Sequence, residues 1–225
     1  MAKEKSSLVS DIIKVCLPLL LIPATFIFVL PYGHDAANLF IGAVFAYVFL
    51  FKSDMRGRRL MVILSTFAFA FETANVASGF YHYVGHPSLP MWVAMGWAVL
   101  GWYIVSLIPV FRKVEEWVAV GANAIALLLV AIQYNFWGVT MLFAAAGPYV
   151  YTRASSTLPT MFFAFGSIMG LVLEVCGTTL GIWAYTNTAG LPATPEFGQL
   201  ALGYATVLIF CYWLAGYDRL EEKAN

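Results

Sequence analysis

The chain has 225 residues, of which 61% are hydrophobic and only 11% are charged. This composition excludes an ordinary soluble domain and predicts an all-α polytopic membrane protein, because runs of about 20 apolar residues are long enough to cross a bilayer. Acidic and basic residues balance at 12 each, so the chain lacks the basic surplus that nucleic acid attracts, and we expect no nucleic-acid partner.

Eight apolar segments follow one another along the chain, and each is predicted to cross the membrane. We expect the first to be retained as a helix, not removed as a signal peptide, because it is long and has a counterpart in the second half. The second and sixth are short for a full span and are expected to tilt or to lie in a thinned bilayer. The segments are residues 11–31, 36–51, 60–82, 89–110, 116–133, 136–151, 158–184 and 197–216.

The lysines and arginines predict an orientation for these eight spans. All of them lie at the N-terminus, at every second joint or near the C-terminus, and the alternate joints contain none. Because cytoplasmic loops carry the excess of Lys and Arg, we expect both termini to be cytoplasmic in a protein of the plasma membrane. The basic residues are Lys3, Lys5, Lys14, Lys52, Arg56, Arg58, Arg59, Arg112, Lys113, Arg153, Arg219 and Lys223.

Residues of the first half recur in the second half at a constant offset, as Glu72 and Glu174 do (174 − 72 = 102). We therefore predict two four-helix repeats of the same orientation, related by an axis along the membrane normal. The repeats are residues 1–110 and 111–217, followed by a polar tail at 218–225. Further pairs in the same register are Ser65/Ser167, Gly79/Gly181, Tyr81/Trp183 and Tyr83/Tyr185.

Glu72 and Glu174 are the only acidic residues well inside a predicted span. Ionisable side chains at membrane depth are costly and by default indicate a functional site. Glu72 follows Arg59 by 13 residues (72 − 59), which at 1.5 Å per residue is roughly 20 Å and places it in the outer half of the bilayer. We expect the two carboxyl groups to face each other across one apolar cavity.

The residues shared by the two halves fall on one face of spans three and seven on a helical wheel. Glycines on this face are expected to let the helices approach or to leave room for a ligand. Tyr81 and Trp183 point the other way on the wheel, which favours an interfacial aromatic belt for both. The face comprises Ser65, Glu72, Gly79 and Tyr83, with Asn75 and His82 beside it, and Ser167, Glu174, Gly181 and Tyr185, with Thr178 beside it.

Two carboxyl groups in an apolar cavity suit acid–base chemistry. One is expected to stay a protonated acid, because two neighbouring carboxylates repel each other, while the other is a carboxylate. The acid would protonate a carbon–carbon double bond, and aromatic rings would stabilise the resulting carbocation. From the sequence we assign the neutral acid to Glu174, and we expect Asn75 to donate a hydrogen bond to a carboxylate at Glu72.

The pattern Glu-x6-Gly-x-Trp-x-Tyr at the end of span seven resembles a motif of the lycopene cyclase domain of membrane carotenoid cyclases. It is also similar to a motif of carotenoid 1,2-hydratase-like membrane proteins and, more loosely, of membrane terpene cyclases. The resemblance implies cofactor-free chemistry on an isoprenoid, a hydrophobic small molecule within the lipid bilayer. The matching residues are Glu174, Gly181, Trp183 and Tyr185 in the second half and Glu72, Gly79, Tyr81 and Tyr83 in the first.

The chain departs from the cyclase pattern at the start of the next span. The cyclases place a proline and a pair of glutamates there, whereas this chain keeps Pro195-Glu196-Phe197 in one half and Pro90-Met91-Trp92 in the other. Glu196 is therefore a further candidate for the site.

Two other functions remain open from the sequence. A proton-coupled transporter of a small or lipophilic solute would equally place acids between parallel repeats. In a non-catalytic lipid-binding protein the glutamates would be structural, each bonded through a protonated carboxyl to a backbone carbonyl or to the other half.

We expect neither a cofactor nor a metal ion. Three histidines, His34, His82 and His86, lie with Asp35 at the predicted outer joints. Gly85 interrupts the helical spacing between the last two histidines, which disfavours a pair of metal ligands on one helix.

Overall fold

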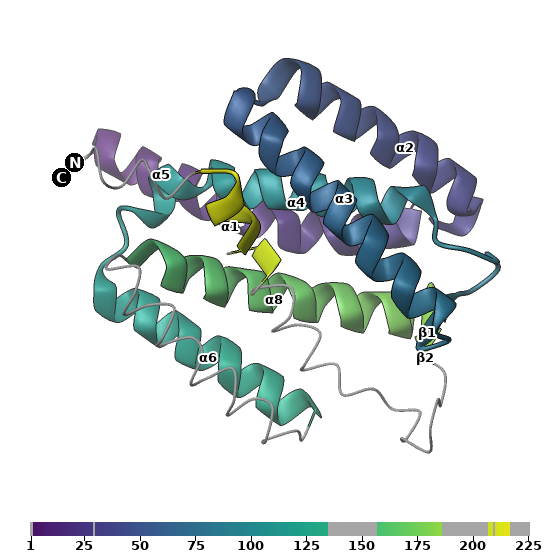
Figure 1. Ribbon diagram of the computed structural model, residues 1–225. Helices are drawn as coiled ribbons and strands as arrows, with labels where there is room; N and C mark the ends of the chain where they lie inside the picture. The colour runs from purple at the N-terminus through teal and green to yellow at the C-terminus, as the bar shows by residue number, and fades with distance from the viewer. Residues whose placement is uncertain (1, 29, 135–156, 186–206, 209, 217–225) are drawn as a thin grey trace.

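A computed structural model describes residues 2–28, 30–134, 157–185, 207–208 and 210–216. Most of these residues are helical, and the long helices form one bundle (Figure 1). Within these described ranges, five helical stretches are long and apolar enough to cross a membrane: Val9–Ile27, His34–Lys52, Met55–Ala77, Met91–Phe111 and Met161–Thr179. The predicted span 136–151 and most of 197–216 lie outside the described residues, so the number of eight spans stays a prediction.

The helices lie within or close to the predicted segments. Asp54 begins one of them by accepting a hydrogen bond from the backbone N–H of Gly57 at 2.7 Å. The elements are α1 (Ala2–Phe28), the 3₁₀ turn η1 (Leu30–Tyr32), α2 (His34–Tyr47), the π-helical η2 (Val48–Lys52), α3 (Met55–Ala77), β1 (Tyr81–Tyr83), α4 (Met91–Ser106), α5 (Ile108–Phe111), α6 (Glu116–Tyr134), α8 (Thr157–Thr179) and β2 (Trp183–Tyr185).

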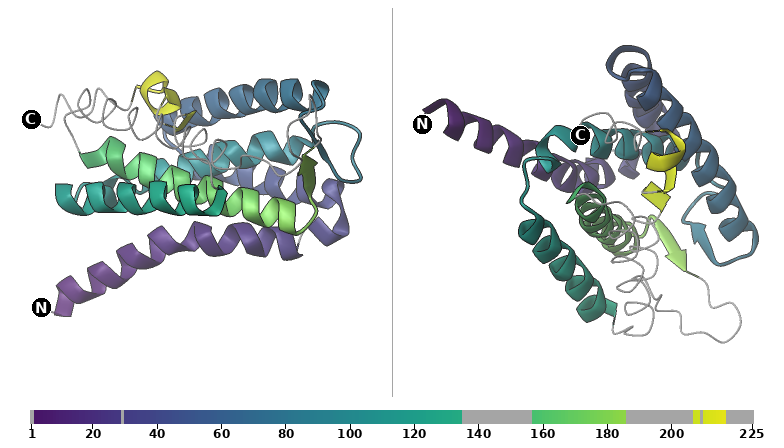
Figure 2. Two further views of the ribbon diagram at one scale, coloured as in Figure 1. Left: turned by 90° about the horizontal axis from the view of Figure 1, so that it is seen from below. Right: turned by 60° about the vertical axis from the view of Figure 1, so that its left-hand side comes forward.

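Helix α4 lies at the centre of the bundle. Helices α2 and α3 pack against it, while α6 and α1 pack along α8 (Figures 1 and 2). Away from the strands, large side chains of α3, α4, α5 and α8 form a fully buried apolar core, in which van der Waals contact is the main attraction if the surroundings are lipid. This core includes Leu60, Met61, Leu64, Ile104, Phe111 and Phe162.

Two prolines, Pro18 and Pro23, lie inside α1. Because Pro18 has no N–H, the carbonyl of Lys14 lacks its usual helical donor. The hydroxyl of Tyr103 on α4 donates to that carbonyl at 2.7 Å. This hydrogen bond satisfies a backbone group that would be costly to leave unpaired in lipid, and it ties α1 to α4.

Helices α3 and α8 have equivalent bounds. Met55 and Thr157 begin them and Ala77 and Thr179 end them, at the same separation (157 − 55 = 179 − 77 = 102). The two helix ends also have the same pattern of backbone hydrogen bonds. The amide of residue 80 donates to the carbonyl of residue 75, and the amide of residue 182 donates to the carbonyl of residue 177. The offset found in the sequence therefore coincides with a shared local structure.

A glycine with positive φ follows each of these helices, at 71° for Gly79 and 66° for Gly181. Glycine adopts this left-handed conformation without the steric cost that a Cβ atom adds. Both helices end before these glycines, so the expectation that the spans remain helical to residues 82 and 184 is wrong.

Beyond the glycines, β1 and β2 form a two-stranded antiparallel ribbon, which the helical periodicity of the sequence does not predict. His82 pairs with Ala184 at its centre, flanked by the pairs Tyr81↔Tyr185 and Tyr83↔Trp183. The ribbon joins the ends of α3 and α8, so the residues after both predicted acids are brought to one place (Figure 1).

Candidate functional site

A cavity of about 620 Å³ lies among α1, α2, α3, α4, α8 and the ribbon. Its volume is in the range of sites that bind drug-sized ligands. Glu72 and Glu174 both line it, which is the juxtaposition expected from the sequence. Most other lining residues are apolar or aromatic, and among the described residues that line it none is Lys, Arg or His.

Glu174 is held by two donors from the ribbon. Its side chain is only 2% exposed, and its Oε2 accepts hydrogen bonds from Trp183 Nε1 at 3.2 Å and Tyr185 Oη at 2.8 Å. Because β2 follows the glycine turn at Gly181, the strand returns Trp183 and Tyr185 toward the helix that carries the carboxyl group. These contacts fix the carboxyl group in one orientation.

Glu72 is held by a donor from a different helix. Its side chain is 5% exposed, and its Oε1 accepts a hydrogen bond from Trp97 Nε1 of α4 at 3.1 Å. The two carboxyl groups interact electrostatically. Their environments differ, because the donors to Glu174 follow it in the chain whereas the donor to Glu72 comes from the next span.

Two tyrosines lie within the electrostatic reach of both carboxyl groups. Burial raises the pKa of Tyr83 well above its ordinary value, and Glu72 and Glu174 raise it further. Burial, followed by the charge of Glu174, likewise raises the pKa of Tyr185. Both phenols therefore stay neutral at physiological pH, and Tyr185 keeps the proton that it donates to Glu174.

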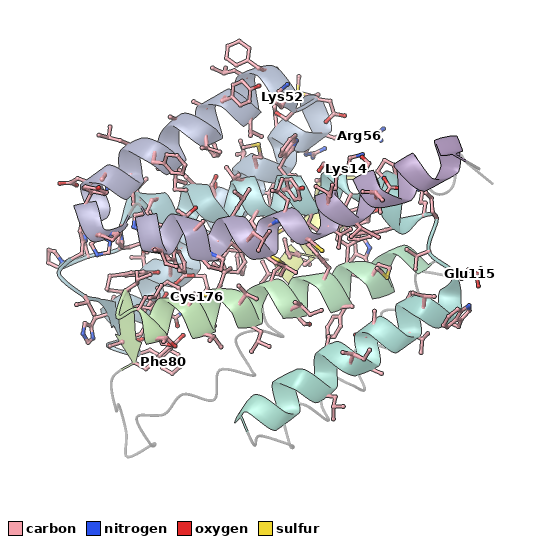
Figure 3. The ribbon with its side chains drawn as sticks, turned by 180° about the vertical axis from the view of Figure 1, so that it is seen from behind. Lys14, Lys52, Arg56, Phe80, Glu115 and Cys176 are labelled. Carbon is pink, nitrogen blue, oxygen red and sulfur yellow. The ribbon has the colours of Figure 1, made fainter. Side chains whose placement is uncertain are left out.

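Aromatic rings close the cavity at the ribbon end. Tyr83 contacts Trp92 and Trp183 edge-on, with ring centroids 6.2 and 6.0 Å apart. Phe26 of α1 contacts the same two tryptophans at 6.1 and 5.8 Å. Figure 3 places Phe80 and Cys176 at this end of the bundle, whereas Lys14, Lys52, Arg56 and Glu115 lie toward the other end.

Six of the predicted site residues line the cavity: Glu72, Asn75, Tyr83, Glu174, Trp183 and Tyr185. Three hydroxyl residues do not line it and bond to their own helices, Ser65 to the carbonyl of Val62, Ser167 to that of Phe163 and Thr178 to that of Glu174. Such bonds satisfy a hydroxyl group locally. These serines and this threonine are therefore part of the helices and not of the cavity wall.

The other predicted site residues do not line the cavity in the described part of the structure. Gly79, Gly181 and His82 lie beyond the ends of α3 and α8, where the chain is no longer helical. Gly79 and Gly181 form the turns instead of lining the cavity. His82 is exposed and lies on the opposite face of β1 from its buried neighbours, so its expected place beside the site is wrong. Glu196 lies outside the described residues.

The prediction that Tyr81 and Trp183 belong to an interfacial aromatic belt is wrong. Both are buried and both line the cavity. A helical wheel turns each residue by 100°, whereas alternate residues of a strand share a face, so Tyr81 falls on the same side as Tyr83. The helical wheel placed these two side chains on the wrong face because residues 81–83 and 183–185 form strands and not a helix.

Sequence reasoning missed Trp97 and Gly177. No pattern distinguished Trp97 from the other tryptophans of its span. Gly177 corresponds to Asn75 at the offset of 102 (177 − 75) and leaves space for the ring of Trp183, since a Cβ atom there would lie 2.1 Å from that ring. The glycine at the position where the first half has Asn75 was the one feature of the sequence that could have indicated a close contact at residue 177.

The histidines at this end of the bundle take part in hydrogen bonds. Trp92 Nε1 donates to His34 Nδ1 at 3.2 Å, which leaves His34 Nε2 to donate to the carbonyl of Val84 at 2.9 Å. The ring of His86 lies 5.1 Å from that of His34. Within the described ranges, no group of three or more His, Cys, Asp or Glu residues is arranged to hold a metal ion.

Comparison with family models, with curated proteins and with solved structures finds no significant match to this chain. The fold and the site define a helical protein with several candidate membrane spans and a buried pair of carboxyl groups in an aromatic cavity.

Replacing Trp97 by phenylalanine tests the hydrogen bond to Glu72. A smaller aromatic ring remains but the indole N–H donor is lost, so we expect a free energy of unfolding lower by about 1–3 kcal/mol, the usual cost of leaving a buried acceptor unpaired, with the lost ring volume adding to it. Thermal unfolding in detergent measures this change. The matched control is Trp117→Phe, because Trp117 is 72% exposed on α6. Equal melting temperatures for the two variants would show that the hydrogen bond of Trp97 does not contribute to the stability of the fold.

Proposed function

We propose that this chain is an integral membrane enzyme that performs cofactor-free acid–base chemistry on an isoprenoid or terpenoid lipid, as a cyclase, hydratase or double-bond isomerase. The observation that carries the proposal is the pair of buried carboxyl groups of Glu72 and Glu174 on one aromatic cavity. Intramembrane acids are functional by default. The resemblance of both glutamate motifs to the lycopene cyclase domain supports the same chemistry.

The hydrogen bonds favour a division of roles opposite to the one assigned from the sequence. Glu174 accepts two bonds on one oxygen, from Trp183 and Tyr185, and donors of this kind stabilise a carboxylate. Glu72 accepts a single bond from Trp97, and not the bond from Asn75 that the sequence led us to expect. We therefore assign the general acid to Glu72 and the carboxylate base to Glu174.

The reaction then proceeds in two proton transfers. The Glu72 carboxyl group gives its proton to one carbon of a double bond, and the π electrons form the new C–H bond and leave a cation at the other carbon. The faces of Tyr83, Trp92 and Trp183 stabilise this cation. The Glu174 carboxylate takes a proton from a neighbouring carbon, which gives an isomer, or from a water molecule that adds to the cation. In a cyclase, the π electrons of a second double bond of the same molecule first attack the cation to form the ring bond, and Glu174 then removes a proton beside the new cation. Transfer of that proton back to Glu72 completes the cycle.

We also infer that the chain forms eight spans in two parallel four-helix repeats, with both termini cytoplasmic at the plasma membrane. The equal bounds of α3 and α8 and the symmetric register of the ribbon support the repeat. The position of Lys52 and Arg56 at the end away from the ribbon supports the orientation. The two halves differ in one respect. The offset aligns α1 with α6 and α3 with α8, and because α6 packs along α8, the repeat would place α1 along α3. In the structure α1 packs along α8 instead.

A proton-coupled transporter remains the alternative proposal, and it requires a polar path through the bundle. The described residues between the cavity and the basic end form the apolar core around Leu60, Leu64, Phe111 and Phe162. This core favours a reaction chamber that is closed toward the basic end of the bundle over a transport path.

Incubation in heavy water tests the proposal directly. We expect the protein in lipid nanodiscs to transfer deuterium from D₂O to carbon in an isoprenoid substrate, because the added proton comes from a carboxyl group that exchanges with solvent. Mass spectrometry of a panel of prenyl alcohols and hydrocarbons measures the mass gain. An isomerase or cyclase exchanges a hydrogen on carbon for deuterium, whereas a hydratase adds the elements of one D₂O, with one deuterium on carbon. A panel recovered without deuterium on carbon would contradict an enzyme of this class, and pH-driven solute flux in proteoliposomes would then favour the transporter.

A further inference from the structure

Helices α1 and α2 form part of the wall of the cavity. Within this wall Leu21 is 51% exposed and Phe40 is 48% exposed, whereas their neighbours Ile22 and Ile41 are partly buried. A residue that lines a cavity and is also half exposed on the outer surface lies at the rim of an opening. These two residues indicate an opening between α1 and α2, and Phe71 of α3, which also lines the cavity and is 43% exposed, marks a further exposed part of the wall.

Leu21 and Phe40 lie at the same depth in the bundle. Leu21 precedes the end of the first candidate span at Ile27 by six residues (27 − 21), and Phe40 follows the start of the second at His34 by six (40 − 34). At 1.5 Å per residue both are roughly 9 Å from the connection between the helices. The two side chains thus flank one opening at one level.

The divergence of α1 and α2 explains why there is an opening. Gly33, with a φ of 92°, reverses the chain directly before α2. From there α1 packs along α8 while α2 packs against α4, so the two helices separate although they are consecutive in the chain (Figure 3). Pro18 and Pro23 lie within this part of α1, where the missing N–H groups allow a helix to bend.

We propose that this opening is a lateral portal through which the hydrocarbon chain of a membrane-dissolved lipid enters the cavity from the bilayer. The proposal rests on the proposed function, because it identifies the cavity as the reaction chamber. The rim belongs to two apolar candidate spans, so in the proposed membrane setting the medium outside it is lipid and not water. A lipid that enters here brings an apolar end to Glu72 and Glu174 and can leave the rest of its length in the membrane. The substrate is thus a long-chain lipid, and water-soluble substrates are excluded.

Tryptophan substitutions at the rim test the portal. We expect Leu21→Trp and Phe40→Trp to narrow the opening and to lower kcat/KM several-fold for a long prenyl alcohol supplied in the bilayer, with kcat at saturation largely retained. The matched controls are Leu20→Trp and Leu39→Trp, which lie beside the rim residues on the same helices, are 68% and 78% exposed, and do not line the cavity. Equal kinetics in rim and control variants would overturn the proposal.

A second measurement does not depend on turnover. A prenyl alcohol that carries a diazirine on its chain, irradiated in nanodiscs with the wild type and with Glu72→Gln, is expected to label peptides that contain Leu21 and Phe40. Rim variants should lower this labelling and control variants should not. If labelling occurs without any deuterium transfer in the wild type, the portal holds and the proposed chemistry fails. Labelling that avoids α1 and α2 would contradict the portal whatever the turnover.

Discussion

Replacing Glu72 by glutamine is expected to lower the rate of deuterium transfer by about 100-fold or more, because general acid catalysis typically contributes 10² to 10⁴. The glutamine side chain keeps a carbonyl oxygen that can accept the hydrogen bond of Trp97, but it has no proton to give to a double bond. The same loss is expected for Glu174→Gln, which cannot accept the second proton. Turnover is measured by mass spectrometry on the heavy-water reaction.

Folding and substrate binding separate this effect from a structural one. Both variants should keep the helical circular dichroism of the wild type and should still label with the photoactivatable lipid. Glu115→Gln is the matched control, because Glu115 is exposed at the opposite end of the bundle (Figure 3). Turnover that survives in both glutamine variants at the level of the control would rule out the carboxyl pair as the source of catalysis.

Replacing Gly177 by alanine is expected to disrupt the second half of the site. The added Cβ atom would lie 2.1 Å from two atoms of the Trp183 ring, so the ring must move and its hydrogen bond to Glu174 is lost. We expect the free energy of unfolding to fall by about 1–3 kcal/mol, the usual cost of overpacking. Turnover should fall with it, because the orientation of the Glu174 carboxyl group depends on that ring.

Gly121→Ala provides the matched control for Gly177→Ala. Gly121 lies in the interior of α6, and a Cβ atom there would meet nothing within 4 Å. Because alanine is the better helix former, we expect the protein to gain roughly 0.5–1 kcal/mol of stability. Thermal unfolding of both variants measures the difference. A Gly177→Ala protein that melts like the Gly121→Ala protein would show that the Trp183 ring moves aside freely.

The aromatic residues show where sequence reasoning reached its limit. The apolar context of the glutamates identified Glu72 and Glu174, and the offset of 102 residues aligned the two motifs. The wheel placed Tyr83 correctly and Tyr81 wrongly, since both lie on the strand that follows the glycine turn. The sequence carried the turn signal in Gly79, but periodicity gave no sign that a strand would follow.

The order of apolar segments and the position of two acids within them follow from the chain alone, because the cost of charge in a bilayer makes such residues stand out in any membrane sequence. The partners of those acids were decided by tertiary structure. Trp97 reaches Glu72 only because α4 packs against α3, and Tyr185 reaches Glu174 only because the ribbon folds back over the end of α8. Contacts between distant elements depend on how helices cross and where turns reverse the chain, and neither is encoded in a local pattern of apolar residues.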